Sequence, residues 1–197
     1  MLSDNHSRPA LRVVNGGASD ISDAAEPDPE VQALDIVTDA ITQACGDQAL
    51  LLVERKPWGH TAPLPLVAIV ASGVYLIDPL HFPNSRVRVN NEGLDLVVDG
   101  VLKPRVARTM DRNCDALSAA IETGPLPEVT MTAMYCLMQP RFGFMPMSVD
   151  GVDVVTLRGL IRHLKRRGDL DEQARESIHL DLARRLTRST PAKQIRP

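Results

Sequence analysis

The strongest constraint on the fold is a series of three short apolar segments, each bounded by turn-forming residues. They span residues 49–53, 64–71 and 74–77, and Ser72 and Gly73 separate the last two. Apolar segments of this length between turn residues are typical of buried β-strands. The sequence therefore predicts three strands in close succession, with a tight hairpin at residues 71–73.

Helical periodicity appears on both sides of these strands. Apolar residues recur at helical spacing from Val31 to Ala44, and again over residues 104–121, before Gly124 and Pro125. A second hairpin is expected over 86–98, more exposed than the first, and further strands over 129–138 and 152–155. Helices are expected over 157–164 and 170–186, the second capped by Asp171. This order predicts an α/β fold, in which helices flank a mixed central sheet and two helices lie at the C-terminus.

The ends of the chain differ from its middle. Residues 1–30 are acidic, rich in glycine and proline, and without an apolar period, so we expect a disordered acidic tail. One domain is predicted over residues 31–187, since 197 residues with 44% apolar content suffice for a single core. Residues 188–197 are expected to form a basic C-terminal tail.

The distribution of charge points to a candidate binding surface near the C-terminus. Residues 158–197 hold eleven bases and five acids, whereas residues 1–47 hold nine acids and two bases. Four of the bases, Arg158, Arg162, Lys165 and Arg166, recur at helical spacing. Such a face can contact nucleic acid or an acidic partner, or it can simply be a solvated helix surface.

Several other functions find little support in the composition. Aromatic residues make up 3% of the chain, too few for a row of base-stacking platforms, and we expect the single tryptophan, Trp58, to pack against the protein. The three cysteines lack paired spacing and are expected to be reduced and mostly buried. The sequence shows no nucleophile elbow, phosphate-binding glycine loop, signal peptide or membrane-length apolar run. It predicts no cofactor, no membrane contact and a cytoplasmic location.

Three segments resemble one known family. Residues 71–78, Ala-Ser-Gly-Val-Tyr-Leu-Ile-Asp, are similar to a Pro-Ser-Gly-Val-aromatic-Val-Ile-acid hairpin. Residues 55–59 are similar to an Arg-Arg-Ile-Pro-Gly segment, and residues 98–103 to the segment that opens the following helix. On these motifs the chain resembles the nuclease-related domain (NERD) family of the restriction-endonuclease-like PD-(D/E)xK superfamily, over about residues 34–186. The resemblance implies a restriction-endonuclease-like core.

The resemblance also implies where cutting chemistry would lie. The family uses an aspartate, an acid thirteen residues later, and a lysine two residues after that acid, to hold a hard cation and activate water. These positions are Pro65, Asp78 and Leu80 in this chain, so only the acid remains. Asp35 is matched to a helical glutamate of the family. We therefore expect no catalytic residues and no metal ligands.

Three hypotheses follow from these observations. The leading one is a catalytically inactive nuclease-like module that contacts DNA, RNA or a nucleic-acid-associated protein through Arg158, Arg162, Lys165 and Arg166. The second is a divergent nuclease with migrated residues, such as Glu54, Lys56 and His81 around Asp78. The third is a protein-interaction module whose acidic tail engages a basic partner.

Overall fold

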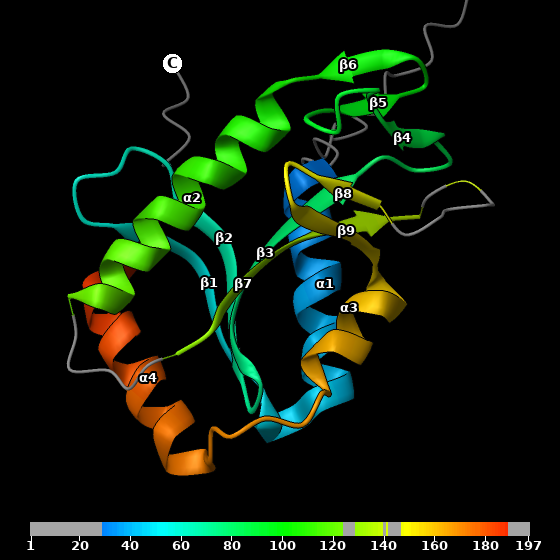
Figure 1. The fold of residues 1–197 in the computed structure, drawn as a ribbon. Helices are drawn as coiled ribbons and strands as arrows, with labels where there is room; N and C mark the ends of the chain where they lie inside the picture. The colour runs from blue at the N-terminus through cyan, green and yellow to red at the C-terminus, as the bar shows by residue number, and fades with distance from the viewer. Residues whose placement is uncertain (1–28, 124–128, 140, 142–146, 189–197) are drawn as a thin grey trace, which may run out of the picture.

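The computed structural model describes residues 29–123, 129–139, 141 and 147–188 (Figure 1). The helices are α1 (Pro29–Cys45), α2 (Arg105–Glu122), α3 (Leu157–Leu164) and α4 (Glu172–Arg185), with a short 3-10 turn η1 (Gly46–Gln48). The strands of the larger sheet are β1 (Leu50–Pro57), β2 (Leu64–Val70), β3 (Gly73–His81), β7 (Met131–Met138), β8 (Met147–Val149), β9 (Val152–Thr156) and β10 (Leu186–Arg188). The strands of the smaller sheet are β4 (Val87–Val89), β5 (Leu96–Val98) and β6 (Val101–Lys103).

The seven-stranded sheet is mixed and has the order β10-β1-β2-β3-β7-β9-β8. The strands β1, β2 and β3 form an antiparallel meander, β7 and β9 add in parallel beyond β3, and β8 and β10 pair antiparallel at the two edges. The parallel β3–β7 pair requires a crossover connection, and α2 lies within it. The predicted α/β class with a mixed, helix-flanked sheet is therefore confirmed.

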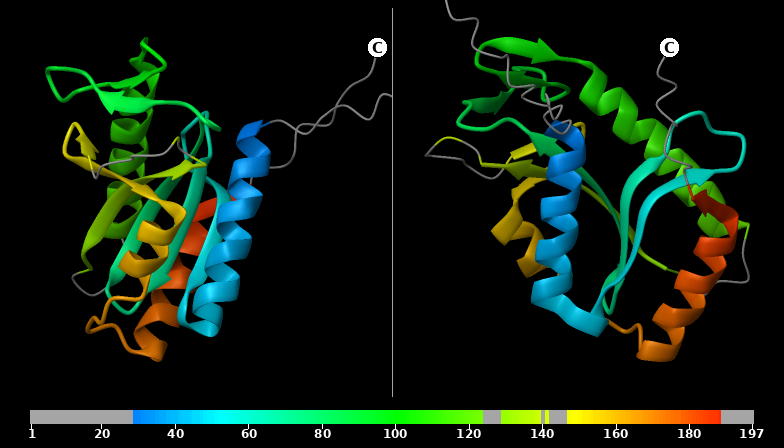
Figure 2. Two further views of the ribbon diagram at one scale, coloured as in Figure 1. Left: turned by 90° about the vertical axis from the view of Figure 1, so that its right-hand side faces the viewer. Right: turned by 180° about the vertical axis from the view of Figure 1, so that it is seen from behind.

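Helices cover both faces of this sheet (Figures 1 and 2). On one face, α2 and α4 contribute Met110, Leu117, Ile178 and Leu182 to a core shared with β1, β2 and β3. On the other face, α1 and α3 build a second core. The period-2 alternation of strand side chains explains how β2 and β3 supply both cores at once.

The local signals that begin the helices follow ordinary capping chemistry. Proline suits the first position of α1, where no backbone donor is needed, and Glu30 in the first turn complements the helix dipole. The Asp171 side chain accepts a hydrogen bond from the Ala174 N–H at 2.8 Å, which confirms the predicted cap of α4.

Close backbone contacts fix the hairpin between β2 and β3. A Cβ on Gly73 would overlap the Thr130 carbonyl, and a Cβ on Gly168 would overlap backbone atoms of Ala71 and Ser72. The Leu170 N–H donates to the Ala71 carbonyl at 3.0 Å. The connection between α3 and α4 is thus packed directly on the predicted tight hairpin.

Several sequence-based expectations need correction. The hairpin over 86–98 is more exposed than the first along β4 and its turn, as expected, but all three residues of β5 are buried, and Leu96 belongs to the core that contains α2 and α4. The strands β6, β8 and β10 were not predicted, and β10 places Arg188 in the sheet rather than in a tail. The helix α1 begins at Pro29, inside the predicted tail, and residues 1–28 and 189–197 lie outside the described part.

Two further findings concern cysteines and membranes. Cys45 and Cys136 are buried, Cys114 is partly buried, and none of the three forms a disulfide, as expected. None of the helices that the structure describes combines the length and hydropathy that crossing a bilayer requires.

Candidate functional site

Two of the catalytic positions implied by the resemblance, Pro65 and Asp78, lie opposite each other on neighbouring strands of the meander. Leu66 of β2 pairs with Ile77 of β3, and the same register continued by one residue brings Pro65 opposite Asp78. On the other side of β2, Val53 pairs with Leu66 and Arg55 with Leu64, so Glu54 lies opposite Pro65. Glu54, Pro65 and Asp78 thus form one row across three strands.

This row does not bring acids together. Pro65 separates the two carboxylate positions and offers neither an oxygen ligand on its side chain nor a backbone N–H. Glu54 is exposed and has a φ of 47°, a left-handed conformation that interrupts the pleat of β1. The row contains a single partly buried carboxylate, Asp78.

The environment of Asp78 disfavours its charge. Burial, and then the negative charge of Glu30, raise the pKa of the Asp78 carboxyl to about 7. On the next strand its parallel partner is Tyr135, whose hydroxyl donates to the Val106 carbonyl at 3.2 Å. Burial, and then the charge of Asp78, raise the pKa of Tyr135. Asp78 itself lies inside β3.

The remaining positions that the resemblance implies lie in different environments. Leu80 is buried in the core that β3 shares with α2 and α4. Asp35 is exposed on α1, whereas the α1 carboxylate that acts on Asp78 is Glu30. His81 is the last residue of β3 and pairs with Met138.

A migrated metal centre is not assembled in the described part of the chain. Among residues 29–123, 129–139, 141 and 147–188, no three histidine, cysteine, aspartate or glutamate side chains approach closely enough to hold a metal ion. Hard cations need several oxygen ligands at once. The set of Glu54, Asp78 and His81 is therefore not brought together as a ligand group.

The four predicted basic residues do share one surface. Arg158 and Arg162 are exposed on α3, Lys165 is its C-cap, and Arg166 follows directly, also exposed. Leu160 and Leu164 anchor the opposite side of α3 in the second core. We call these four side chains the α3 basic face.

The α3 basic face consists of three arginines and one lysine. No carboxylate of the described residues forms an ion pair with any of its members. Burial lowers the pKa of the neighbouring His163, and the charge of Arg166 lowers it further, whereas Asp153 acts in the opposite direction. Cations at a helix C-terminus also complement the dipole, which is the structural explanation for the same residues.

The structure adds three basic residues to the candidate surfaces and corrects the placement of Trp58. Arg105, Arg108 and Arg112 are all exposed on one side of α2, at spacings of three and four. Trp58, which was expected to pack, is 92% exposed. The signal that could have corrected this expectation is the Pro57-Trp58-Gly59 tripeptide, since proline and glycine around one residue favour a surface turn.

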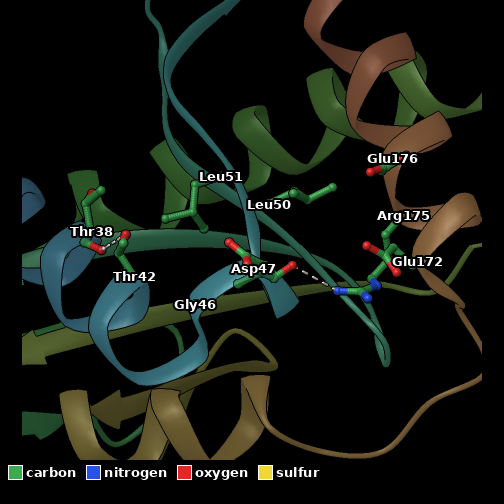
Figure 3. Close-up of a pocket in the computed structure, with 10 residues that line it drawn as sticks. Thr38, Thr42, Gly46, Asp47, Leu50, Leu51, Glu172, Arg175 and Glu176 are labelled. Atoms are coloured by element: carbon green, nitrogen blue, oxygen red, sulfur yellow. Dashed lines mark hydrogen bonds between the residues drawn. The ribbon is translucent and has the colours of Figure 1, made fainter.

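A pocket of about 600 Å³ lies away from these residues, where the end of α1, η1 and the start of β1 meet α4 (Figure 3). Glu172, Arg175 and Glu176 line one side, and Thr38, Thr42 and Asp47 line the other. The Arg175 guanidinium donates to the Gln48 carbonyl at 2.6 Å, which ties α4 to η1. The pocket includes neither the row in the meander nor the α3 basic face.

Comparison with known proteins adds no relative: no protein-family model, curated protein or solved structure matches this chain.

Proposed function

We propose that this chain is a catalytically inactive nuclease-like domain of the nuclease-related type, acting in the cytoplasm as a binding or regulatory module. Its α3 basic face contacts DNA, RNA or a nucleic-acid-associated partner. The observation that carries this proposal is the grouping of Arg158, Arg162, Lys165 and Arg166 on one exposed surface without carboxylate partners in the described residues.

The relation to the nuclease-like family gains support from the arrangement of the strands. The family chemistry needs an aspartate and an acid that converge on one cation. Residues thirteen apart can do so only if their strands are neighbours and in the right register. Here Pro65 and Asp78 fall opposite each other when the β2–β3 register is continued by one residue. The aspartate position is thus occupied by proline at the place where the cation ligand would be needed.

The loss of catalysis follows from the same geometry. A single partly buried carboxylate, with a pKa raised to about 7, binds a strongly hydrated cation poorly because part of it is neutral at physiological pH. The lysine position is Leu80, whose side chain is buried in the core. What the domain retains is a rigid frame that presents a charged helix.

The binding proposal is tested by the salt dependence of affinity. Fluorescence anisotropy with labelled duplex DNA and labelled RNA should give affinities that fall with salt concentration. Each phosphate neutralised on duplex DNA adds about 0.9 to the slope of log affinity against log salt. Changing Arg158, Arg162 and Arg166 to glutamine should flatten that slope by roughly two to three units if each contacts one phosphate.

A matched control removes the same charge elsewhere. Arg105, Arg108 and Arg112 are also exposed on α2, and changing them to glutamine should leave most of the slope intact. An equal effect of both triple variants would assign binding to net charge rather than to α3. If the wild-type protein shows no salt-sensitive binding to either nucleic acid, the proposal fails and the module that binds only proteins becomes the better hypothesis.

A further inference from the structure

The turn that follows β1 presents the only tryptophan of the chain to solvent. The His60 N–H donates to the Pro57 carbonyl at 3.2 Å, which closes a four-residue turn over Trp58 and Gly59. Gly59 has a φ of 80°, as the third position of a type II turn requires. Trp58 occupies the second position and is 92% exposed. The indole is therefore held at the tip of a hydrogen-bonded turn.

Two arginines face each other at the base of this turn. Arg55 of β1 pairs with Arg188 of β10 in the antiparallel register, and Lys56 pairs with Thr187. The Thr187 hydroxyl donates to the Lys56 carbonyl at 3.2 Å and so helps to hold this register. Like charges on directly opposite strand residues are destabilising unless something compensates them.

Nothing in the described part of the chain compensates this pair. Neither Arg55 nor Arg188 has a carboxylate partner there, and the Arg55 Nε is buried without a hydrogen-bond acceptor. Burial, and then the charge of Arg188, lower the pKa of Arg55. Glu54 is adjacent in sequence and exposed but forms no ion pair with Arg55. An oxyanion between the two guanidinium groups would satisfy both.

The combination of an exposed indole and an unneutralised arginine pair identifies a class of ligand. Bases of single-stranded nucleic acid stack on aromatic side chains, and the connecting phosphates bind arginine. Bases of a duplex are already stacked on one another and do not offer their faces. An acidic peptide would use the arginines but would leave the indole without a specific partner.

We propose that Trp58, Arg55 and Arg188 form a binding site for single-stranded nucleic acid, in which a base stacks on the indole and a phosphate lies between the arginines. The site is separate from the α3 basic face. It lies at the β10–β1 edge, whereas α3 follows β9 near the opposite edge, and Figures 1 and 2 place the β1–β2 loop and α3 on opposite sides of the molecule.

Intrinsic fluorescence tests this site directly, because Trp58 is the only tryptophan. Titration with a single-stranded thymidine or uridine oligonucleotide of about eight residues, within the usual range of single-strand site sizes, should quench the emission saturably. The matching duplex should quench less. In a separate anisotropy measurement with labelled oligonucleotide, Trp58→Ala should weaken single-strand binding roughly 5- to 150-fold, the range for losing one stacked base.

Paired variants separate this site from the function proposed above. The double variant Arg55→Gln with Arg188→Gln should abolish the quenching, while the double variant Arg158→Gln with Arg162→Gln, which loses the same charge from α3, should preserve it. Circular dichroism checks that each variant is folded. The proposal would be overturned if neither the thymidine nor the uridine oligonucleotide quenched the emission. It would also be overturned if the duplex quenched the emission as strongly as the single strand. Equal quenching by polyglutamate would overturn it as well, and would assign the site to acidic proteins.

Discussion

At the residue scale, Asp78 couples stability to pH. Its pKa is 3.8 in the unfolded chain and about 7 in the fold, so the folded state holds more protons between these values. The free energy of unfolding should therefore fall as pH rises through this window, by at most about 1.4 kcal/mol per pH unit and by less because Asp78 is only partly buried. The stabilising effect of the neutral form is complete below the unfolded pKa.

Replacement of Asp78 by asparagine removes this titration. Urea denaturation at pH 5 and pH 8 should show that Asp78→Asn gains stability relative to the wild-type protein mainly at pH 8. The matched control is Asp39→Asn at an exposed position of α1, which should keep the wild-type difference between the two pH values. An unchanged pH dependence in Asp78→Asn would mean that the carboxyl is not held neutral in the fold.

The row of Glu54, Pro65 and Asp78 predicts the absence of nuclease activity. Loss of one positioned acid-base group alone costs about 10²- to 10⁴-fold in rate. Two of the three positions that the resemblance implies are Pro65 and Leu80, whose side chains carry no such group. We expect no cleavage of plasmid or single-stranded DNA with Mg²⁺ or Mn²⁺ and no cation-induced rise in melting temperature.

A single substitution tests whether a second carboxylate in this row would create a cation site. Pro65→Asp places a second carboxylate opposite Asp78 and should make the melting temperature sensitive to Mn²⁺. Leu80→Lys is a poorer choice, since it would put a charge into the core. Wild-type cleavage that disappears in Asp78→Ala would refute the inactive assignment and favour migrated catalytic residues.

At the element scale, a substitution that disturbs the packing of the α3–α4 connection on the β2–β3 hairpin should lower the free energy of unfolding. Gly168→Ala would direct a methyl group into backbone atoms of Ala71 and Ser72, which cannot move as a flexible side chain can. Overpacking of this kind typically costs about 1–3 kcal/mol. Chemical denaturation should show this loss, whereas the adjacent exposed Arg167→Ala should stay close to wild type. If Gly168→Ala left the free energy of unfolding unchanged, the α3–α4 connection would be able to shift away from the hairpin without loss of stability.

The elements differ in how far the sequence could predict them. The helices α1, α2, α3 and α4 and the strands of the meander have recognisable apolar patterns, and the structure places them within a few residues of expectation. The strands β6, β8 and β10 have three residues each, too few for a period to be recognised. Their existence depends on the neighbour that each pairs with, which is tertiary information.

The candidate sites likewise differ in how far the sequence could predict them. The α3 basic face was predictable because its four residues share one helix and one period. The pairing of Arg55 with Arg188 was not predictable, because it joins two strands that lie far apart in the sequence. Trp58 was wrongly assigned to packing, since its size favoured burial while the turn around it required exposure.

At the scale of the whole molecule, the two proposed surfaces lie near opposite edges of one sheet. The core on one face joins α2 and α4 to the meander, and the core on the other joins α1 and α3 to it. The sheet between them holds both edges in a fixed relation. One flexible strand, or two different partners, could be engaged at both edges at once, and linked engagement strengthens binding without any new contact.

The pairing of β10 with β1 also bears on how the chain is made. Thr187 and Lys56 are 131 positions apart, so a ribosome that has just released β1 must still synthesise most of the protein before the partner strand emerges. Translation proceeds at about 5–20 residues per second, which leaves the edge of β1 open for several seconds. An open strand edge invites pairing with other chains. The nascent protein is therefore vulnerable to aggregation from the emergence of β1 until the emergence of β10, and chaperones that bind extended segments would have a target in β1.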